Sequence, residues 1–396
     1  MEFENKPVTV SLPRELEESI NSVIQKEGYT SYDMKCRNLS TDGGNYIGVL
    51  YEIDVTGSTL DGVKETNIFV KNKLENEQLK IYSITDCFER ENYIYTELAN
   101  IFLKLQNDEK IADDEKFKMA KCFDECNASS IILENLVKRG FKTYPRMDVI
   151  SVAYAECCIQ HLAKFHALSF VIQNREPDYF KRKIEPLNQP FIFGDDWHGF
   201  VGNMCKYSIN CLDPDVKDKV EESILKKVHD YGKYMNDATG VRTLCHGDYK
   251  HNNIMAKEVV SIFLFLLAID YQLLHYGKPI LDLLYFIFNG TDQDFRREHL
   301  NHLKNLYYNT MITFLDHFAM DIKAVFPKED FEREFKEKLD FGLMINVFYV
   351  PFLFACEEDA PDVVNQSLDT LAFKVDERFG ERFRGVVDDF IRWGYI

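Results

Sequence analysis

The pattern of apolar and polar positions changes along the chain from a strand-rich first part to a helical remainder. Residues 13–26 have apolar side chains at helical spacing, which predicts a leading helix. Residues 46–71 have the pattern of two strands joined by a turn at residues 57–62. A helix is predicted over residues 86–105 and a short buried strand over residues 131–133. This order suits a small N-terminal lobe built around a sheet.

From residue 146 onward the pattern is mainly helical. Apolar residues at helical spacing predict a long core helix over residues 148–170. Further helices are predicted over residues 283–288, 303–318, 331–348 and 363–379. No repeat, low-complexity segment or linker rich in proline, glycine or serine interrupts the sequence. We therefore predict an α+β fold with a β-rich N-terminal lobe of residues 1–135 and a larger, mainly helical C-terminal lobe of residues 136–396.

Composition fits a folded protein with a large core and disfavours several classes of partner. Hydrophobic residues make up 45% of the 396 residues, and aromatic residues make up 14%. The formal net charge is −18, which argues against nucleic acid or an anionic membrane surface as a partner. An anionic ligand would therefore have to meet local positive charge. Nothing in the sequence identifies a protein partner.

Cysteine usage and apolar stretches indicate the compartment. The ten cysteines are scattered and form no C-x-x-C pair, which favours buried free thiols in a reducing compartment over zinc or disulfide sites. Residues 1–5 are acidic and lack an apolar run, so no signal peptide is predicted. The longest apolar stretch, residues 262–269, is far shorter than the roughly 20 residues that a membrane helix needs. We therefore expect a cytoplasmic protein.

The clearest chemical signal lies at residues 244–253, which read LCHGDYKHNN. Asp248 and Asn253 have the H-x-D-x-x-x-x-N spacing of kinase-type phosphotransferases, and an apolar strand that ends at Asp270 follows. Asp248 can accept a proton from a substrate hydroxyl, which makes it the candidate catalytic residue. Asn253 and Asp270 offer the oxygen ligands that Mg²⁺ prefers. The alternative is a turn followed by an unrelated buried strand, and the full spacing favours the phosphotransfer site.

Further segments carry a family resemblance. They are residues 132–136 (ILENL) with 140–142 (GFK), 162–167 (LAKFHA), 270–272 (DYQ) with 276–279 (YGKP), and 281–286 (LDLLYF). These segments resemble the ecdysteroid kinase-like family, also called CHK kinase-like, which is related to choline kinases and aminoglycoside phosphotransferases. The resemblance extends from about Asn45 to the C-terminus.

The resemblance implies both a fold and an activity. The expected fold is bilobal and protein-kinase-like. The expected activity is that of an ATP- and Mg²⁺-dependent kinase that phosphorylates a hydroxyl group of a small molecule. The acceptor implied by the family is an ecdysteroid or a hydroxylated xenobiotic, and choline-like alcohols fit less well.

A lysine and a glutamate are the candidates for the phosphate side of the nucleotide site. Lys71 ends an apolar strand whose alternation places Lys71 and Phe69 on one face. The resemblance implies that Lys71 holds the α- and β-phosphates and that Glu91, on the following helix, is its partner. An exposed lysine at a strand end is the alternative for Lys71, and Lys73 is a competitor on the same face.

Two segments are expected to hold the nucleotide through their backbone. Residues 42–48 (DGGNYIG) stand where a phosphate loop is expected but do not form G-x-G-x-x-G, so an ordinary turn is an open alternative. Glu134 and Leu136 lie in the segment that the resemblance identifies as the hinge, whose N–H and C=O groups would contact adenine in an apolar slot. Asn135 stands where the family more often has Asp. Because backbone groups make these contacts, we expect no effect from that difference.

Three residues near the motifs have structural explanations. His246 is interpreted as a residue that packs the catalytic loop rather than relaying protons, and His166 as a hydrogen-bonded core histidine. Asp282 is either a helix N-terminal residue or, as the resemblance implies, a carboxylate that braces the catalytic loop.

Aromatic residues around the acidic pair Asp195 and Asp196 are candidates for an acceptor pocket. They are Phe191, Phe193 and Trp197, together with Tyr285 and Phe286 from a later segment. Ordinary core packing explains them equally well.

The hairpin between Asn253 and Asp270 departs from the family pattern. Relatives usually have a polar or glycine-bearing turn there, whereas this chain offers poor turn residues around 257–258 or 260–261. A shortened or distorted hairpin would disturb the metal-binding geometry. The alternative to an active kinase is therefore a non-catalytic kinase-like protein that binds nucleotide or a lipophilic ligand.

Overall fold

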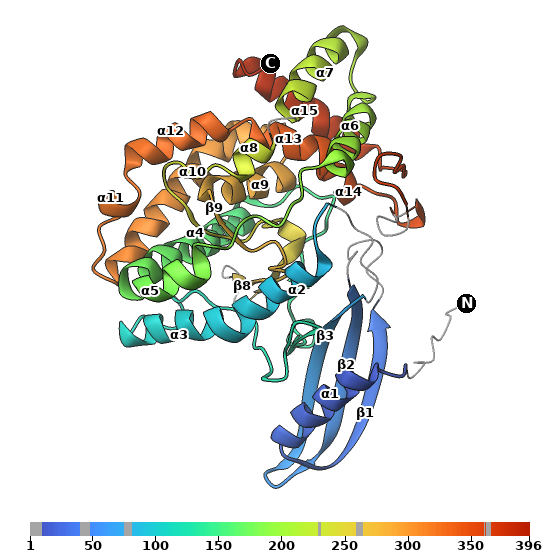
Figure 1. Ribbon diagram of the computed structural model, residues 1–396, viewed down its shortest axis with the longest axis vertical. Helices are drawn as coiled ribbons and strands as arrows, with labels where there is room; N and C mark the ends of the chain where they lie inside the picture. The colour runs from blue at the N-terminus through green and yellow to red at the C-terminus, as the bar shows by residue number, and fades with distance from the viewer. Residues whose placement is uncertain are drawn as a thin grey trace.

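An antiparallel sheet forms the N-terminal part of the protein, and helices form most of the remainder (Figure 1). The computed structural model describes residues 10–39, 48–74, 81–228, 231–258, 264–359, 361 and 366–396. In Figure 1 the sheet lies below the large helical lobe. The arrangement confirms the predicted bilobal, protein-kinase-like α+β fold.

Alternation along the third strand decides which side chains face the interior of the protein. The strands are β1 (Tyr29–Leu39), β2 (Gly48–Thr59), β3 (Gly62–Lys73) and β4 (Ser130–Glu134), paired antiparallel in that order. Ile68 and Val70 on β3 are buried in a core shared with helix α1 (Arg14–Lys26) on one face of the sheet. Lys71 therefore lies on the opposite face, together with Phe69.

The face of the sheet that carries Lys71 packs on a helical segment. This segment consists of α2 (Ile84–Tyr93), one π-helical turn η1 (Ile94–Leu98) and α3 (Ala99–Asp108). Ser83 caps α2, since its hydroxyl accepts the N–H of Asp86 at 3.2 Å. Arg90 on α2 donates to the backbone carbonyl of Leu274 at 2.6 Å. This bond fixes α2 to the C-terminal lobe.

Two small sheets of the C-terminal lobe carry the loops of the motifs. One contains β5 (Lys142–Thr143), β7 (Ile254–Glu258) and β8 (Leu264–Ala268), and the other pairs β6 (Thr243–Cys245) with β9 (His275–Gly277). The long helix α4 (Val152–Arg175) packs on α10 (Gln293–Asp316). Helix α9 (Pro279–Gly290) is buried along its whole length, so it forms part of the centre of the lobe.

Shorter helices complete the described part of the C-terminal lobe. They are α5 (Pro177–Tyr179), η2 (Phe180–Ile184), α6 (Asp195–Ile209), α7 (Pro214–Val228), α8 (Tyr231–Met235), η3 (His251–Asn253), α11 (Ile322–Val325), α12 (Lys328–Lys338), α13 (Phe341–Phe348), α14 (Val350–Leu353), η4 (Glu357–Asp359) and α15 (Arg378–Arg392).

Most predicted elements are confirmed, but three predictions need correction. Residues 331–348 form two helices, α12 and α13, rather than one. They separate at Asp340, whose carboxylate accepts hydrogen bonds from Lys227 and Tyr234. A helix over residues 363–379 is wrong for the described part, because residues 366–377 are not helical and the helix there is α15. The predicted helix of residues 283–288 lies inside the longer α9, which begins at Pro279 and ends at Gly290.

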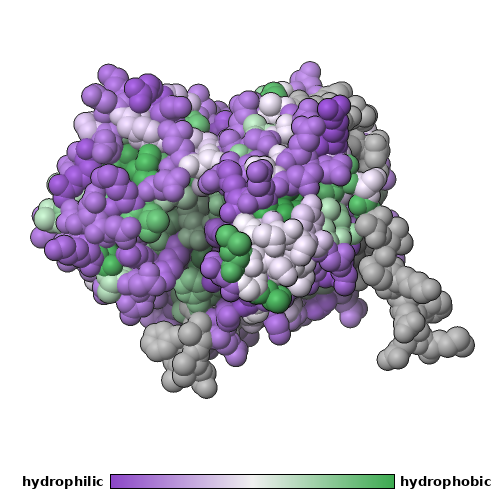
Figure 2. Space-filling model, turned by 90° about the horizontal axis from the view of Figure 1, so that it is seen from below, coloured by the Kyte–Doolittle hydropathy of each residue, from purple (hydrophilic) through white to green (hydrophobic). Residues whose placement is uncertain are grey.

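The described helices include none that is both long and apolar enough to cross a bilayer. Seen from below, the visible face is mostly hydrophilic, and a hollow near its middle has hydrophobic residues on its walls (Figure 2).

Candidate active site

The predicted catalytic loop connects β6 to the one-turn helix η3 and requires a glycine at its second position. Gly247 has φ = +82°, a left-handed conformation. A Cβ atom there would lie 2.3 Å from the carbonyl oxygen of Leu273. Both observations exclude a larger residue without rearrangement. The glycine of the H-G-D motif is thus explained by the backbone path that places Asp248.

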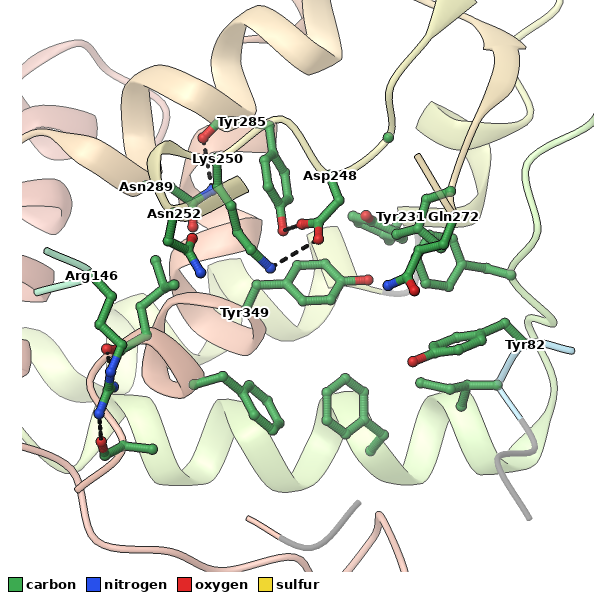
Figure 3. Close-up of a pocket in the computed structure, with 18 of the residues that line it drawn as sticks. Tyr82, Arg146, Tyr231, Asp248, Lys250, Asn252, Gln272, Tyr285, Asn289 and Tyr349 are labelled. Atoms are coloured by element: carbon green, nitrogen blue, oxygen red, sulfur yellow. Dashed lines mark hydrogen bonds and ion pairs between the residues drawn. The ribbon is translucent and has the colours of Figure 1, made fainter. Parts of the chain in front are cut away.

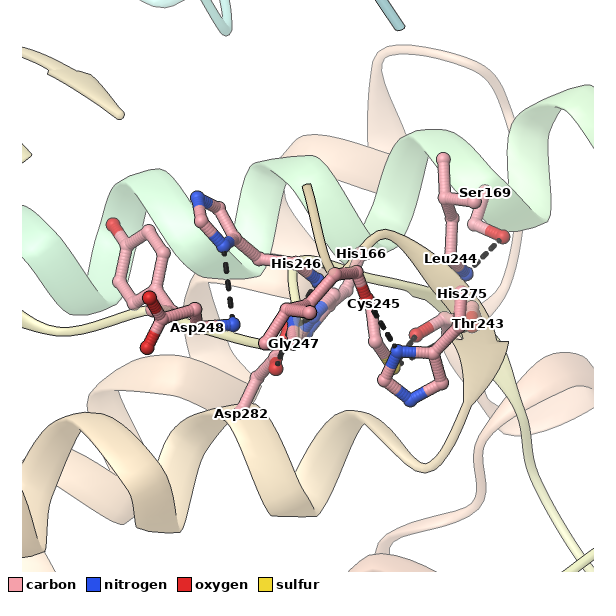
Figure 4. A network of polar contacts seen from close by, with 12 residues as sticks. His166, Ser169, Thr243, Leu244, Cys245, His246, Gly247, Asp248, His275 and Asp282 are labelled. Carbon is pink, nitrogen blue, oxygen red and sulfur yellow. Dashed lines mark hydrogen bonds and ion pairs between the residues drawn. The ribbon is translucent and has the colours of Figure 1, made fainter. Parts of the chain in front are cut away.

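Asp282 holds this loop from below (Figure 4). Its carboxylate accepts the N–H of His246 at 2.6 Å and the N–H of Gly247 at 3.0 Å. It also contacts Nε2 of His166 at 3.1 Å, and Nδ1 of His166 lies 2.6 Å from the hydroxyl of Tyr307. Burial by itself raises the pKa of Asp282, but the hydrogen bond from His166, together with the nearby histidines, outweighs burial, and the pKa lies below its usual value. Of the two predicted explanations, the geometry favours the brace.

His246 is a packed and hydrogen-bonded residue. Its Nδ1 accepts the N–H of Asp248 at 3.3 Å, and its Nε2 lies 3.1 Å from the carbonyl oxygen of Ile269. Its ring centre is 4.4 Å from that of Tyr271. Burial lowers the pKa of His246, which keeps the ring neutral. Both nitrogens are used in holding the loop, as the structural interpretation of His246 predicts.

Asp248 lies at the junction of the loop and a pocket. It is 5% exposed, and its Oδ1 accepts the hydroxyl of Tyr285 at 2.7 Å. Its Oδ2 accepts Nδ2 of Asn253 at 2.8 Å and Nζ of Lys250 at 2.9 Å. Figure 3 shows Tyr285 and Lys250 converging on this carboxylate. The donors hold Asp248 in one orientation.

Asn253 and Asp270 are brought together by a regular hairpin. Strands β7 and β8 pair without a shift from Ile254 with Ala268 to Glu258 with Leu264, and the N–H of Ile269 donates to the carbonyl of Asn253 at 2.9 Å. The prediction of a distorted hairpin is therefore wrong for the described residue pairs, because β7 and β8 are regularly paired next to Asn253 and Asp270. The predicted turn at residues 260–261 lies outside the described residues.

Lys71 forms the cationic centre on the other side of Asp270. Its Nζ contacts Oε2 of Glu91 at 2.8 Å, Oδ1 of Asp270 at 2.5 Å and Oε1 of Gln272 at 3.1 Å. Asp270 has φ = +66°, a left-handed conformation that Asp tolerates better than most residues. By contrast, Nζ of Lys73 contacts the hydroxyl of Thr85 at 3.4 Å. The geometry thus joins Glu91 to Lys71 rather than to Lys73.

Lys71 and Asp270 stabilise each other's charged forms, whereas burial and Asp270 oppose the charge of Glu91. Burial by itself lowers the pKa of Lys71, but the carboxylates of Asp270 and Glu91 raise it above its usual value. Burial by itself raises the pKa of Asp270, and Lys71 outweighs that effect, so the pKa is lowered. For Glu91, burial and the charge of Asp270 prevail, and the pKa is raised. Lys71 and Asp270 therefore form a charged pair at neutral pH.

The predicted hinge residues follow the last strand of the N-terminal sheet. Strand β4 ends at Glu134, whose N–H donates to the carbonyl of Lys121 at 2.9 Å. The carbonyl of Leu136 accepts the N–H groups of Arg139 and Phe141, each at 3.0 Å. The N–H of Leu136 donates to no backbone carbonyl within the described residues. The predicted phosphate loop lies outside the described residues except for Gly48.

An aromatic pocket opens beside Asp248. It has a volume of about 150 Å³, and its aromatic lining includes Phe191, Phe200, Tyr231, Tyr285, Tyr349 and Phe352. Of the predicted acceptor residues, Phe191 and Tyr285 line this pocket, whereas Phe193, Trp197 and Phe286 do not. Trp197 is 1% exposed and packs on Tyr231 and Phe348 in the core.

No sequence pattern pointed to two of the tyrosines in this pocket. Tyr231 and Tyr349 come from α8 and from the residue before α14, far from each other and from the motif in the chain. Only the packing of α8, α13 and α9 brings them to Asp248.

The cysteines and the one cluster of metal-ligating side chains give no indication of a second metal site within the described residues. All ten cysteines are free. Within the described residues, His166, Cys245 and Asp282 form the one cluster with metal-ligand proximity. Asp282 and His166 are already hydrogen-bonded to each other and to the loop, so this cluster belongs to the brace.

Comparisons with known proteins identify what the chain resembles. A model of the ecdysteroid kinase-like family matches residues 42–320. Choline kinase LicA from Streptococcus pneumoniae is 14% identical with a TM-score of 0.41, and the match covers 95% of this chain and 99% of that chain. Plasmodium vivax ethanolamine kinase is 13% identical with a TM-score of 0.47, covering 99% and 94%. No curated protein matches the chain. The structural scores are low, so the family match carries the assignment.

Proposed function

The chain belongs to the ecdysteroid kinase-like family, and from this premise we propose that it transfers the γ-phosphoryl group of ATP to a small-molecule hydroxyl group with the help of Mg²⁺. The position of Asp248 carries the proposal. Its carboxylate lines an aromatic pocket and is hydrogen-bonded to Asn253. Asn253 is joined through the hairpin to Asp270, which pairs with Lys71. An acceptor site and a phosphate site therefore meet at one carboxylate.

The transfer step uses these residues in distinct roles. The acceptor oxygen forms a bond to the γ-phosphorus as the bond from that phosphorus to the β–γ bridging oxygen breaks. The electron pair of the broken bond leaves with ADP, and the hydroxyl proton passes to Asp248. Lys71, fixed by Glu91, holds the α- and β-phosphates. Backbone groups of Glu134 and Leu136 contact the adenine.

Asn253 and Asp270 fit a Mg²⁺ ion. Because Nδ2 of Asn253 donates to Asp248, the amide oxygen is left for a metal. The carboxylate of Asp270 is 26% exposed and uses Oδ1 for Lys71, which leaves Oδ2. Hard oxygen donors of this kind suit Mg²⁺. When bound, the ion would neutralise negative charge on the phosphate oxygens.

The pocket supports a largely apolar alcohol as the acceptor. Its described lining is rich in aromatic residues, and its charged residues are Arg146, Asp248 and Lys250. Aromatic faces bind a quaternary ammonium group as well as an apolar alcohol, so the preference for an apolar alcohol over choline rests on the family. An ecdysteroid or a hydroxylated xenobiotic fits the apolar surface better.

Two further parts of the proposal concern organisation and compartment. We take the lobes to divide at residue 135, directly after β4. The ten free cysteines suit a reducing compartment such as the cytoplasm.

A thermal-shift titration with ATP tests the proposal against a non-catalytic relative. A ligand that binds only the native state stabilises it by about 2.7 kcal/mol at one hundred times its dissociation constant. We expect ATP with Mg²⁺ to raise the melting temperature more than ATP with a chelator. Equal curves with and without Mg²⁺ would favour the non-catalytic alternative.

A further inference from the structure

The lining of the proposed acceptor pocket contains two buried amide oxygens without a hydrogen-bond partner. They are Oδ1 of Asn252, in η3, and Oδ1 of Asn289, on α9. Asn289 is 1% exposed. Among the described residues, neither oxygen has a donor within hydrogen-bond distance. A buried acceptor left without a donor is costly, so folded proteins rarely keep one.

The Asn289 amide is oriented by the helix that carries it. Its Nδ2 donates to the backbone carbonyl of Tyr285, one turn earlier, at 2.7 Å, which leaves the amide oxygen to accept. In Figure 3 the amides of Asn252 and Asn289 lie next to each other, and α9 contacts η3. Arg146 and Lys250 flank them in the same view. Asn252 and Asn289 thus form an amide pair in the wall of the pocket.

The amide pair lies close to Asp248 in the structure. Asn252 follows Asp248 by four residues in the catalytic loop. Tyr285, whose hydroxyl donates to Asp248 at 2.7 Å, precedes Asn289 by one helical turn, a rise of about 6 Å. A molecule with a hydroxyl group at Asp248 can therefore reach the amide pair with a second group about one helical turn away.

The chemistry of the amide pair selects a neutral donor. Both unpaired atoms are acceptors, so the ligand group must donate, which excludes a carboxylate, a sulfate or a carbonyl. The charged residues of the described lining are two cations and one carboxylate. A protonated amine would therefore meet net positive charge. A hydroxyl group donates without charge and can share its proton between both oxygens.

Resting on the proposed function, we propose that the acceptor is a diol, of which one hydroxyl group contacts Asp248 and receives the phosphoryl group while the other is bound by Asn252 and Asn289. The aromatic lining holds the apolar frame between the two hydroxyl groups. The amide pair therefore discriminates a diol from a single alcohol of the same shape.

Three small benzyl alcohols test this proposal without a known acceptor. Ligand-observed NMR at millimolar concentrations would measure their affinities in a buffer that contains Mg²⁺-ADP and so permits no transfer. The three are 1,3-benzenedimethanol, 3-ethylbenzyl alcohol, in which a methyl group replaces one hydroxyl group, and 3-(aminomethyl)benzyl alcohol, which is protonated. We expect the parent to bind the diol about tenfold more tightly than the ethyl alcohol, and to bind the amine more weakly than the diol.

Variants of the amide pair connect this preference to its source. Asn289→Leu is similar in size and removes the acceptor, so the preference for the diol should fall below about twofold. Asn289→Thr keeps an acceptor oxygen on the same face of α9, and its preference should lie between those of the parent and Asn289→Leu. Asn309→Leu, the same change at an exposed position of α10, is the control and should keep the preference of the parent. Circular dichroism checks that each variant is folded, and Asn252→Ala provides the same test if Asn289→Leu is not.

Several results would overturn the proposal. They are equal affinities of the parent for the diol and the ethyl alcohol, as expected if an ordered water satisfies both oxygens, tighter binding of the amine, and an Asn289→Leu variant that keeps the preference. Binding of neither alcohol would overturn it too, because the pocket would then take no acceptor of this class. Failure of the proposed function would instead appear as absence of ³²P transfer from ATP while the diol still binds preferentially.

Discussion

Replacing Asp282 by Asn tests whether the buried carboxylate holds the catalytic loop. In the parent, Oδ2 accepts the N–H of His246 and contacts His166, and Oδ1 accepts the N–H of Gly247. The asparagine side chain of the variant would keep one oxygen and present an NH₂ group in place of the other. A donor would then face a buried N–H donor, whichever way the amide is turned.

The expected cost follows from these contacts. The bonds that remain lose their charge assistance, about 1 kcal/mol each, and one buried unpaired donor costs about 1–3 kcal/mol. We expect Asp282→Asn to lower the free energy of unfolding by about 3–5 kcal/mol. A loop displaced by about 1 Å would also lower turnover on the order of 10²-fold.

Urea unfolding of parent and variant measures the first effect. Asp388→Asn, an exposed change on α15, is the control and should stay within about 0.5 kcal/mol of the parent. If Asp282→Asn also unfolds within about 1 kcal/mol of the parent, the loop does not depend on this carboxylate and the reasoning is refuted.

Three further expectations concern the nucleotide site and acid stability. Lys71→Ala should lower turnover by about 10²-fold or more, whereas Lys73→Ala should lower it only slightly. If a rate assay gave the reverse order, the phosphate contact would be assigned to Lys73. Asp270→Asn should weaken Mg²⁺-ATP binding in calorimetry, and parent-like affinity would remove Asp270 from the metal site. Burial lowers the pKa of His161 and of His251 to about 4, so the unfolded chain binds more protons below pH 6.5 and stability falls as the pH falls from 6.5 to 4. In urea unfolding, the free energy of unfolding at pH 5 should be lower than at neutral pH by about 2 kcal/mol per histidine. A free energy of unfolding that does not change with pH would contradict this.

Local spacing made parts of the site predictable. Asp248 and Asn253 lie in one short loop, so their separation along the chain sets their separation in space. The face of Lys71 followed from strand alternation, because neighbouring side chains on a strand point to opposite faces. Asp270 was found because it ends an apolar strand of the hairpin that begins after Asn253. Each inference needed only a few consecutive residues.

The proposed acceptor pocket was less predictable because distant segments build it. Phe193 and Trp197 were candidates through closeness in sequence to Phe191, yet Trp197 packs into the core of the lobe. Tyr231 and Tyr349 reach the pocket only through helix packing, and no local pattern encodes that contact.

Two predictions failed because the pattern of buried side chains in a segment did not match its secondary structure. Strand β1 was not predicted, because Cys36 is the one buried side chain in it and all the others are exposed or half-buried. Such a strand lacks the alternation that marks a half-buried sheet. The segment predicted as a helix over residues 363–379 contains Leu368, Leu371 and Phe373, which are buried although residues 366–377 are not helical.

Transfer of ³²P from γ-labelled ATP to a small alcohol tests the central claim most directly. Hydroxylated steroids, xenobiotic alcohols and choline would be screened with the parent and with Asp248→Asn, which keeps the size of the side chain. We expect Mg²⁺-dependent labelling of an apolar alcohol by the parent, and a rate lower by about 10²–10⁴-fold for Asp248→Asn with nucleotide binding largely intact. A variant that transfers phosphate within a few-fold of the parent would contradict the role of Asp248 and the mechanism built on it.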